Sequence, residues 1–268
     1  MIISKDTKLC LMNSRWGSRL TFNLNFMEHA IETGNLGIDI AHDRKIRYSH
    51  QNLQELKFYV ESGSSLQEGF YFSKLKSYLA AQELNLGLTY LTLKGIHSSE
   101  LKVEFTIHSP IAITSELEND EKIKILHSPF FYVDIEIENN SKVPHEVSTF
   151  IGFDMQGQLI NKNLVFDDNG KNYIEKDQKK LVLKRLQQDT SKYYKDNEDD
   201  SRGFLAYNEL KSGEKLTLKY IYAGFIGKPV FLNKLNRRKS QKLKFYYTKF
   251  FTDIDNVLDF AEQNYVKI

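Results

Sequence analysis

Alternation of apolar and polar residues with a period of two constrains the fold of this chain more than any other feature. The segments "LKVEFTI" (101–107) and "FFYVDIEIEN" (130–139) place an apolar side chain at every second position, with charged or hydroxyl side chains between. Successive side chains of a strand point to opposite faces, so this pattern predicts strands with one face in a core. Further strands are predicted at 19–26, 145–153, 179–186 and 203–224. The predicted fold class is all-β, an antiparallel two-sheet sandwich or supersandwich.

Two polar turns are predicted to close hairpins between these strands. The turn "NNSKVP" (139–144) separates the strand at 130–139 from the strand at 145–153. Ser212 and Gly213 separate the two apolar halves of 203–224. Short polar connections are typical of antiparallel strands that are neighbours in one sheet.

Helical spacing occurs in two places. Residues 72–88 are compatible with a short helix, although their second half is equally compatible with a strand. Residues 252–266 give the clearest helix, because Thr252 or Asp253 can cap it and apolar residues follow at intervals of three and four. The predicted division of the chain is a β-sandwich domain at 1–251 and a C-terminal connector helix at 252–268.

Composition argues against several function classes. The chain has 268 residues and a net charge of +2, with 37 basic and 35 acidic side chains, so no nucleic-acid partner is indicated. Cys10 is the only cysteine, which excludes an internal disulfide and a cysteine-based zinc site. The sequence shows no membrane-spanning run and no signal-peptide pattern. We therefore expect no membrane partner and a cytoplasmic location, or a secreted protein if a signal has been removed.

The usual catalytic motifs are missing from the sequence. It has no phosphate-binding glycine loop, no nucleophile elbow and no pair of histidines at metal-ligand spacing, so no catalytic residue, cofactor or metal is predicted. Arg15 and Trp16, in "NSRWGSR" (13–19), are candidates for contact with carbohydrate. Trp16 could stack on a sugar ring, although a tryptophan more often fills a sandwich core.

Two further candidates, His108 and His127, lie in the similar segments "IHSPI" (107–111) and "LHSPF" (126–130). Each is predicted to lie at a strand end, where a histidine could transfer protons to and from a sugar. The alternative is structural: the proline of each segment fixes where a strand begins or ends, and the serine supplies a turn hydrogen bond.

Taken together, several segments resemble a known family. "VEFTIHSPI" and "HSPFFYVDIEIENNSKVPHEVSTFIGFD" span 103–154, followed by "GFLAYNELKSGEKLTLKYIYAG" (203–224) and "FYYTKFFTDIDNVLDFAEQ" (245–263). This series resembles the N-terminal β-sandwich domain of bacterial glycoside hydrolases of the glucosylceramidase and β-xylosidase type. In that family the catalytic domain is an (α/α) barrel. The resemblance covers residues 100–268 best.

The resemblance implies a non-catalytic accessory domain that supports such a barrel and contacts carbohydrate. The family's catalytic carboxylates lie on the barrel, so none is carried over to this chain, which is expected to hydrolyse no glycosidic bond by itself. The terminal helix would lead to the barrel. An apolar face formed by Phe245, Tyr247, Phe250 and Phe251 is then expected to be exposed in this chain and to favour a homo-oligomer.

Two alternatives remain open. A free-standing carbohydrate-binding sandwich would display a row of exposed aromatic side chains, with Trp16, Tyr71, Tyr193 and Tyr194 as candidates. A mutarotase-like sugar enzyme, with a related sandwich fold, would bring a histidine and a glutamate together in one cleft.

Overall fold

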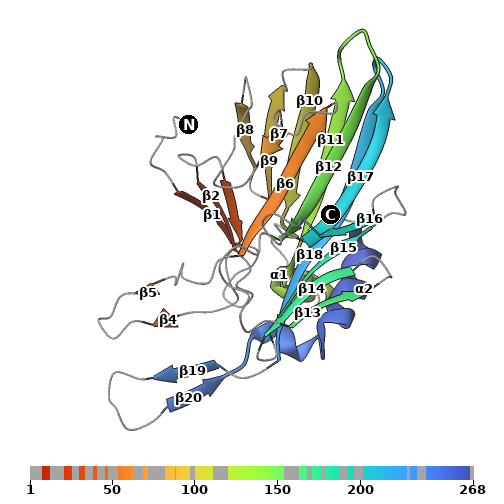
Figure 1. The fold of residues 1–268 in the computed structure, drawn as a ribbon. Helices are drawn as coiled ribbons and strands as arrows, with labels where there is room; N and C mark the ends of the chain where they lie inside the picture. The colour runs from red at the N-terminus through yellow and green to blue at the C-terminus, as the bar shows by residue number, and fades with distance from the viewer. Residues whose placement is uncertain are drawn as a thin grey trace.

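Most of the described strands belong to two large antiparallel sheets (Figure 1). The computed structural model describes residues 8–12, 21–25, 30–33, 39–40, 46–47, 54–62, 69–71, 82–87, 89–96, 100–110, 120–153, 163–167, 171–176, 179–186, 192–195, 202–227, 230–233 and 240–265. The all-β prediction is confirmed.

The first sheet has the order β1-β2-β3-β6-β12-β17-β16, with β7 paired to β6. Its strands are β1 (Lys8–Met12), β2 (Thr21–Asn25), β3 (Ala30–Thr33), β6 (Gln54–Ser62), β7 (Gly69–Tyr71), β12 (His145–Phe153), β16 (Lys192–Lys195) and β17 (Arg202–Leu210).

The second sheet has the order β13-β14-β15-β18-β11-β10-β9-β8. Its strands are β8 (Gln82–Leu86), β9 (Tyr90–Ile96), β10 (Leu101–His108), β11 (Phe130–Asn139), β13 (Asn163–Asp167), β14 (Lys171–Lys176), β15 (Lys179–Arg185) and β18 (Lys215–Ile226). Two short pairs complete the described strands: β4 (Asp39–Ile40) with β5 (Ile46–Arg47), and β19 (Val230–Asn233) with β20 (Ser240–Leu243).

The predicted alternation builds the core between the sheets. Every second residue of β10, from Leu101 to Ile107, is buried, and the odd-numbered residues of β11 that pair with them are buried too. On β18 the same face carries Tyr220, whose ring stacks on Phe204 of the first sheet at a centroid distance of 5.8 Å. This face of the second sheet therefore points toward the first sheet.

The prediction of two hairpins is wrong, because the strands on either side of each turn belong to different sheets. β11 and β12 follow each other closely in the chain, yet β11 pairs with β10 and β18, whereas β12 pairs with β6 and β17. β17 and β18 are likewise split between the sheets. Both polar turns are thus arches that carry the chain from one sheet to the other. Gly213, at a φ of 77°, provides the left-handed conformation that the second arch needs.

The buried side chain of Asn139 joins the two arches. Its amide nitrogen donates to the carbonyl of Val143 in the first arch and to that of Leu210, where the second arch begins, both at 2.8 Å. Its amide oxygen accepts from the backbone and the hydroxyl of Ser141, at 2.9 and 2.8 Å. Its backbone bonds Gly213 and Glu214. The amide thus holds together two turns that are distant in sequence.

The predicted C-terminal helix is confirmed as α2 (Ile254–Asn264), capped by Asp253, whose carboxylate accepts from the Asn256 backbone. It covers part of the outer face of the second sheet, contacting β11, β15 and β18. The sequence of β11 reflects this cover, because its first four residues, "FFYV", are all buried, whereas polar residues alternate from Asp134 onward.

The expected exposed apolar face before this helix is wrong. Tyr247 and Phe251 are buried in one cluster with the apolar side of α2, and Phe245 and Phe250 pack half-buried against that cluster. These residues therefore belong to the core of the C-terminal segment. Oligomer formation itself stays a prediction.

Two other segments differ from expectation or extend it. Of residues 72–88, the described part contains the strand β8, so the strand alternative holds there.

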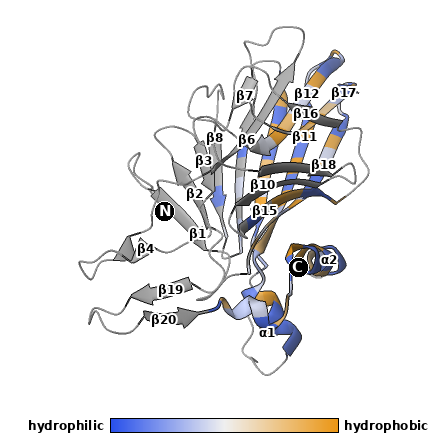
Figure 2. Ribbon diagram, turned by 60° about the horizontal axis from the view of Figure 1, so that its bottom comes forward, coloured by the Kyte–Doolittle hydropathy of each residue, from blue (hydrophilic) through white to orange (hydrophobic). Residues whose placement is uncertain are grey.

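A short helix, α1 (Asp120–His127), was not predicted, and His127 therefore ends a helix rather than a strand. α1 and α2 lie near each other at one end of the second sheet (Figure 2), with the Lys124 ammonium over the rings of Phe251 and Phe260. None of the helices in the described residues is long and apolar enough to cross a membrane.

We predict that Asn139→Ala destabilises the fold by about 3 kcal/mol, because the substitution leaves the carbonyl of the buried residue Leu210 and the backbone N–H of the buried residue Ser141 without their partner. Urea unfolding followed by tryptophan fluorescence and circular dichroism measures the change. The exposed neighbour Asn140 provides the control, and Asn140→Ala should stay within about 0.5 kcal/mol of the wild type. Equal effects of the two substitutions would contradict a structural role for the Asn139 amide.

A second prediction concerns His127, whose ring contacts Tyr246 at a centroid distance of 4.5 Å. Burial lowers the pKa of His127 below its ordinary value of 6.5, and no described group bonds its buried Nδ1. Unfolding therefore takes up a proton at pH values below about 6.5, so the free energy of unfolding declines as the pH falls from there.

His127→Phe keeps a ring against Tyr246 and removes this titration, so its stability should decline less between about pH 7 and pH 5. Urea midpoints of both proteins at the two pH values give the comparison. Identical declines in wild type and variant would show that His127 contributes nothing to the pH dependence.

Candidate functional site

The part of the second sheet's outer face that α2 leaves uncovered is polar. Strand register arranges its residues in three rows across β9, β10 and β11. Opposite residues on paired antiparallel strands point to the same side, so the rows share one face. The rows are Tyr90–His108–Tyr132, Thr92–Thr106–Asp134 and Lys94–Glu104–Glu136.

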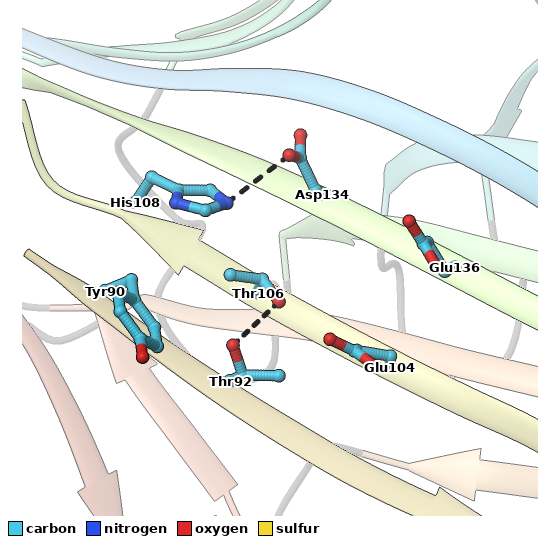
Figure 3. Close-up of a pocket in the computed structure, with 7 residues that line it drawn as sticks. All are labelled: Tyr90, Thr92, Glu104, Thr106, His108, Asp134 and Glu136. Atoms are coloured by element: carbon cyan, nitrogen blue, oxygen red, sulfur yellow. Dashed lines mark hydrogen bonds and ion pairs between the residues drawn. The ribbon is translucent and has the colours of Figure 1, made fainter. Parts of the chain in front are cut away.

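A pocket of about 260 Å³ opens on this face. Figure 3 shows how β9, β10 and β11 present its side chains to a common space. The lining consists of two threonines, a tyrosine, a histidine and three carboxylates: Tyr90, Thr92, Glu104, Thr106, His108, Asp134 and Glu136. All seven side chains come from paired strands, whose backbone hydrogen bonds fix their spacing.

Three contacts organise the pocket. The hydroxyls of Thr92 and Thr106 are 3.0 Å apart and form a hydrogen bond at the base. The His108 Nε2 atom lies 3.4 Å from an Asp134 oxygen. At the other end of the lining, Glu104 forms an ion pair of 3.0 Å with Lys94 of β9.

Asp134 lies where the open pocket meets the region covered by α2. The hydroxyl of Tyr265, the C-cap residue that follows α2, donates to the Asp134 carboxylate, with distances of 3.0 and 3.1 Å to its two oxygens. Lys219 lies opposite Asp134 on β18, and its ammonium is 4.8 Å from the centre of the Tyr265 ring. A hydrogen bond with Tyr265 raises the pKa of Lys219, and burial raises the pKa of Tyr265. Both groups therefore keep their protons at neutral pH.

The pocket suits a small ligand that carries several hydroxyl groups. Carboxylates accept hydrogen bonds from hydroxyls, threonine hydroxyls donate or accept, and an imidazole can do either. Tyr90, with 41% of its surface exposed, offers an aromatic face at the edge. Within the described ranges, no group of three or more histidine, cysteine, aspartate or glutamate side chains is arranged to hold a metal ion.

The structure places the sequence-predicted residues in different locations. His108 lines the pocket, at the end of β10 as predicted. His127 belongs to α1 and is not part of the lining. Arg15 and Trp16 lie outside the described residues. Tyr71, Tyr193 and Tyr194 lie on strands of the first sheet, whereas the pocket lies on the second.

Sequence reasoning missed the other six lining residues, although their signal was present. Glu104, Thr106, Asp134 and Glu136 are the polar half of the alternation that predicted the strands. A polar face of a strand usually indicates only contact with water. The additional signal is that hydroxyls and carboxylates at matching positions of two long strands face the same side.

Comparison with known proteins gives only distant similarities. No family model matches the sequence, and no curated protein matches it. Among solved structures, the heparan sulfate lyase HepC from Pedobacter heparinus is 14% identical with a TM-score of 0.38, over 62% of this chain and 28% of the lyase. A putative aldose 1-epimerase from Klebsiella pneumoniae is 9% identical with a TM-score of 0.44, over 93% of this chain and 81% of the other. The GH36 α-galactosidase AgaB from Geobacillus stearothermophilus is 8% identical with a TM-score of 0.39, over 84% of this chain and 40% of the galactosidase. The chain thus spans less than a third of the lyase, and similarity at this level does not assign its function.

Proposed function

We propose that the pocket on the second sheet binds a carbohydrate, and that the chain acts as a non-catalytic accessory domain of a glycoside hydrolase. In this proposal a catalytic domain of the (α/α)-barrel type is its partner. The observation that carries the binding proposal is the lining itself, in which three carboxylates, two threonine hydroxyls and one imidazole converge beside an exposed tyrosine.

Hydrogen bonding supports a neutral sugar as the ligand. A carboxylate that accepts from a sugar hydroxyl forms a charge-assisted bond, stronger than a bond between neutral groups. Thr92 and Thr106 are each at least nine-tenths buried and bond each other, so their hydroxyls are already ordered before a ligand arrives. Side chains held by paired strands lose little freedom on binding, which favours affinity.

The aromatic edge supports the same ligand class. Tyr90 of β9 lies opposite His108 of the paired strand β10, with ring centroids 6.4 Å apart. Sugar rings present apolar C–H groups on one face and hydroxyls around the edge. An exposed tyrosine can cover the apolar face while the carboxylates bond the hydroxyls.

The contacts of the carboxylates support a binding role over hydrolysis. Glycoside hydrolysis requires a carboxylic acid that protonates the leaving oxygen, and such acids lie in environments that favour the neutral form. Glu104 instead pairs with Lys94, and Asp134 contacts His108 and accepts from Tyr265. Both carboxylates therefore already have partners within the protein, and their remaining lone pairs can accept hydrogen bonds from a ligand.

The binding proposal predicts that the chain binds a neutral mono- or disaccharide with millimolar or better affinity. Titration of a sugar panel, followed by two-dimensional NMR of the backbone amides, should move the resonances of β9, β10 and β11. Asp134→Asn should weaken binding about tenfold, because the charged acceptor is lost. Glu209→Gln, an exposed carboxylate on the first sheet, is the control. A panel that leaves the three strands unmoved contradicts the proposal.

A second candidate function, mutarotase-like chemistry, is favoured by one observation: His108 shares the pocket with Glu104 and Glu136. A histidine and a glutamate could act as the acid and base that open and close a sugar ring at its anomeric carbon. The prediction of this candidate is accelerated interconversion of α- and β-glucose or galactose, measured by polarimetry. The acceleration should disappear in His108→Gln, and a rate equal to buffer for the wild type leaves the accessory role as the better candidate.

A further inference from the structure

The C-terminal helix contributes a hydrogen bond to the pocket that none of the lining strands supplies. Asp134 has a side chain that is 22% exposed and lies between two partners. Tyr265 approaches both of its oxygens, while His108 approaches one of them from the pocket side. A donor shared between the two oxygens of a carboxylate restricts rotation of the carboxylate.

The position of Tyr265 is itself fixed by contacts of α2 with the sheet. The hydroxyl of Tyr132 donates to the carbonyl of Ala261 at 2.7 Å, one turn before Tyr265. The rings of Tyr132 and Tyr265 meet edge to face at a centroid distance of 5.0 Å. Glu262 of α2 forms an ion pair with Lys184 of β15. These contacts anchor the end of the helix on β11 and β15.

A positive charge, the ammonium of Lys219, lies beside the Tyr265 ring, 4.8 Å from its centre. The Tyr265 hydroxyl donates to Asp134. The phenol cannot turn away from Asp134 without losing this hydrogen bond.

We propose that Tyr265 is a positioning residue, whose hydroxyl holds the Asp134 carboxylate toward His108 and thereby completes the sugar site. The inference rests on the proposed carbohydrate binding for its affinity test, and its geometric claim has a test without sugar.

Tyr265→Phe removes the hydroxyl and keeps the ring against Tyr132, so we expect sugar affinity to fall about tenfold. The same substitution in an Asp134→Asn background should cause no further loss, because Tyr265 acts through that carboxylate. Asp253→Ala is the control for a loosened helix, since it removes the cap at the opposite end of α2 and leaves Asp134 untouched. It should lower the unfolding temperature and keep the affinity.

The affinity arm overturns the inference if Tyr265→Phe binds sugar as the wild type does. Losses that simply add in the double variant, or an equal loss in Asp253→Ala, overturn it as well, since both indicate a general effect of the helix.

The second arm needs no ligand. The ¹⁵N chemical shift of His108 Nε2 reports its contact with Asp134, and Tyr265→Phe should move this shift toward the value in Asp134→Asn. An unchanged shift overturns the positioning role. If no sugar binds to the wild type, the proposed function fails, while this measurement still decides whether Tyr265 orients the carboxylate.

Discussion

The buried amide of Asn139 is the interaction on which the arrangement of the two sheets depends. It bonds both arches, and each arch carries the chain between the sheets. A buried amide without partners destabilises a fold, so the four hydrogen bonds of Asn139 favour one relative position of the two turns over others. β11 ends at the first arch and β18 begins after the second, and their pairing creates the middle of the second sheet. The face that carries the pocket is thus a consequence of this polar contact.

The outer face of the second sheet divides into a covered region and an open one, and Asp134 marks the boundary. Before it, β11 is apolar on both faces, and the C-terminal helix covers the outer one. From Asp134 onward, the outer face carries carboxylates, with Asp134 opposite Thr106 and Glu136 opposite Glu104 of β10. Glu104 and Glu136 lie directly opposite each other, an arrangement of like charges that normally destabilises a sheet. Such a cost is typical of positions that serve a ligand.

Local features were predictable from the sequence, and pairing between distant segments was not. The strands at 101–108 and 130–139 and the Asp253 cap follow from spacing and residue type alone. The turn 139–144 has the polar residues of a hairpin, but the same residues suit an arch, because both begin and end an antiparallel strand. The choice depends on Asn139 reaching Leu210, a contact that no local pattern contains. The same holds for the pocket. His108 was predicted from its motif, whereas the role of Asp134 depends on its contact with Tyr265, which is distant in sequence.

The contact between the two arches also bears on how the chain folds. Asn139 and Leu210 are 71 residues apart in sequence, and so are Ser141 and Ser212, which bond across the same arches. β18 must find its place between β15 and β11 before the sheet is continuous. Closing so long a loop loses entropy before any contact compensates for it, and chains dominated by distant strand pairs fold in milliseconds to seconds rather than microseconds. Until β18 pairs with it, this edge of β11 can pair with other chains, so slow closure of the arches lengthens the time available for misassembly.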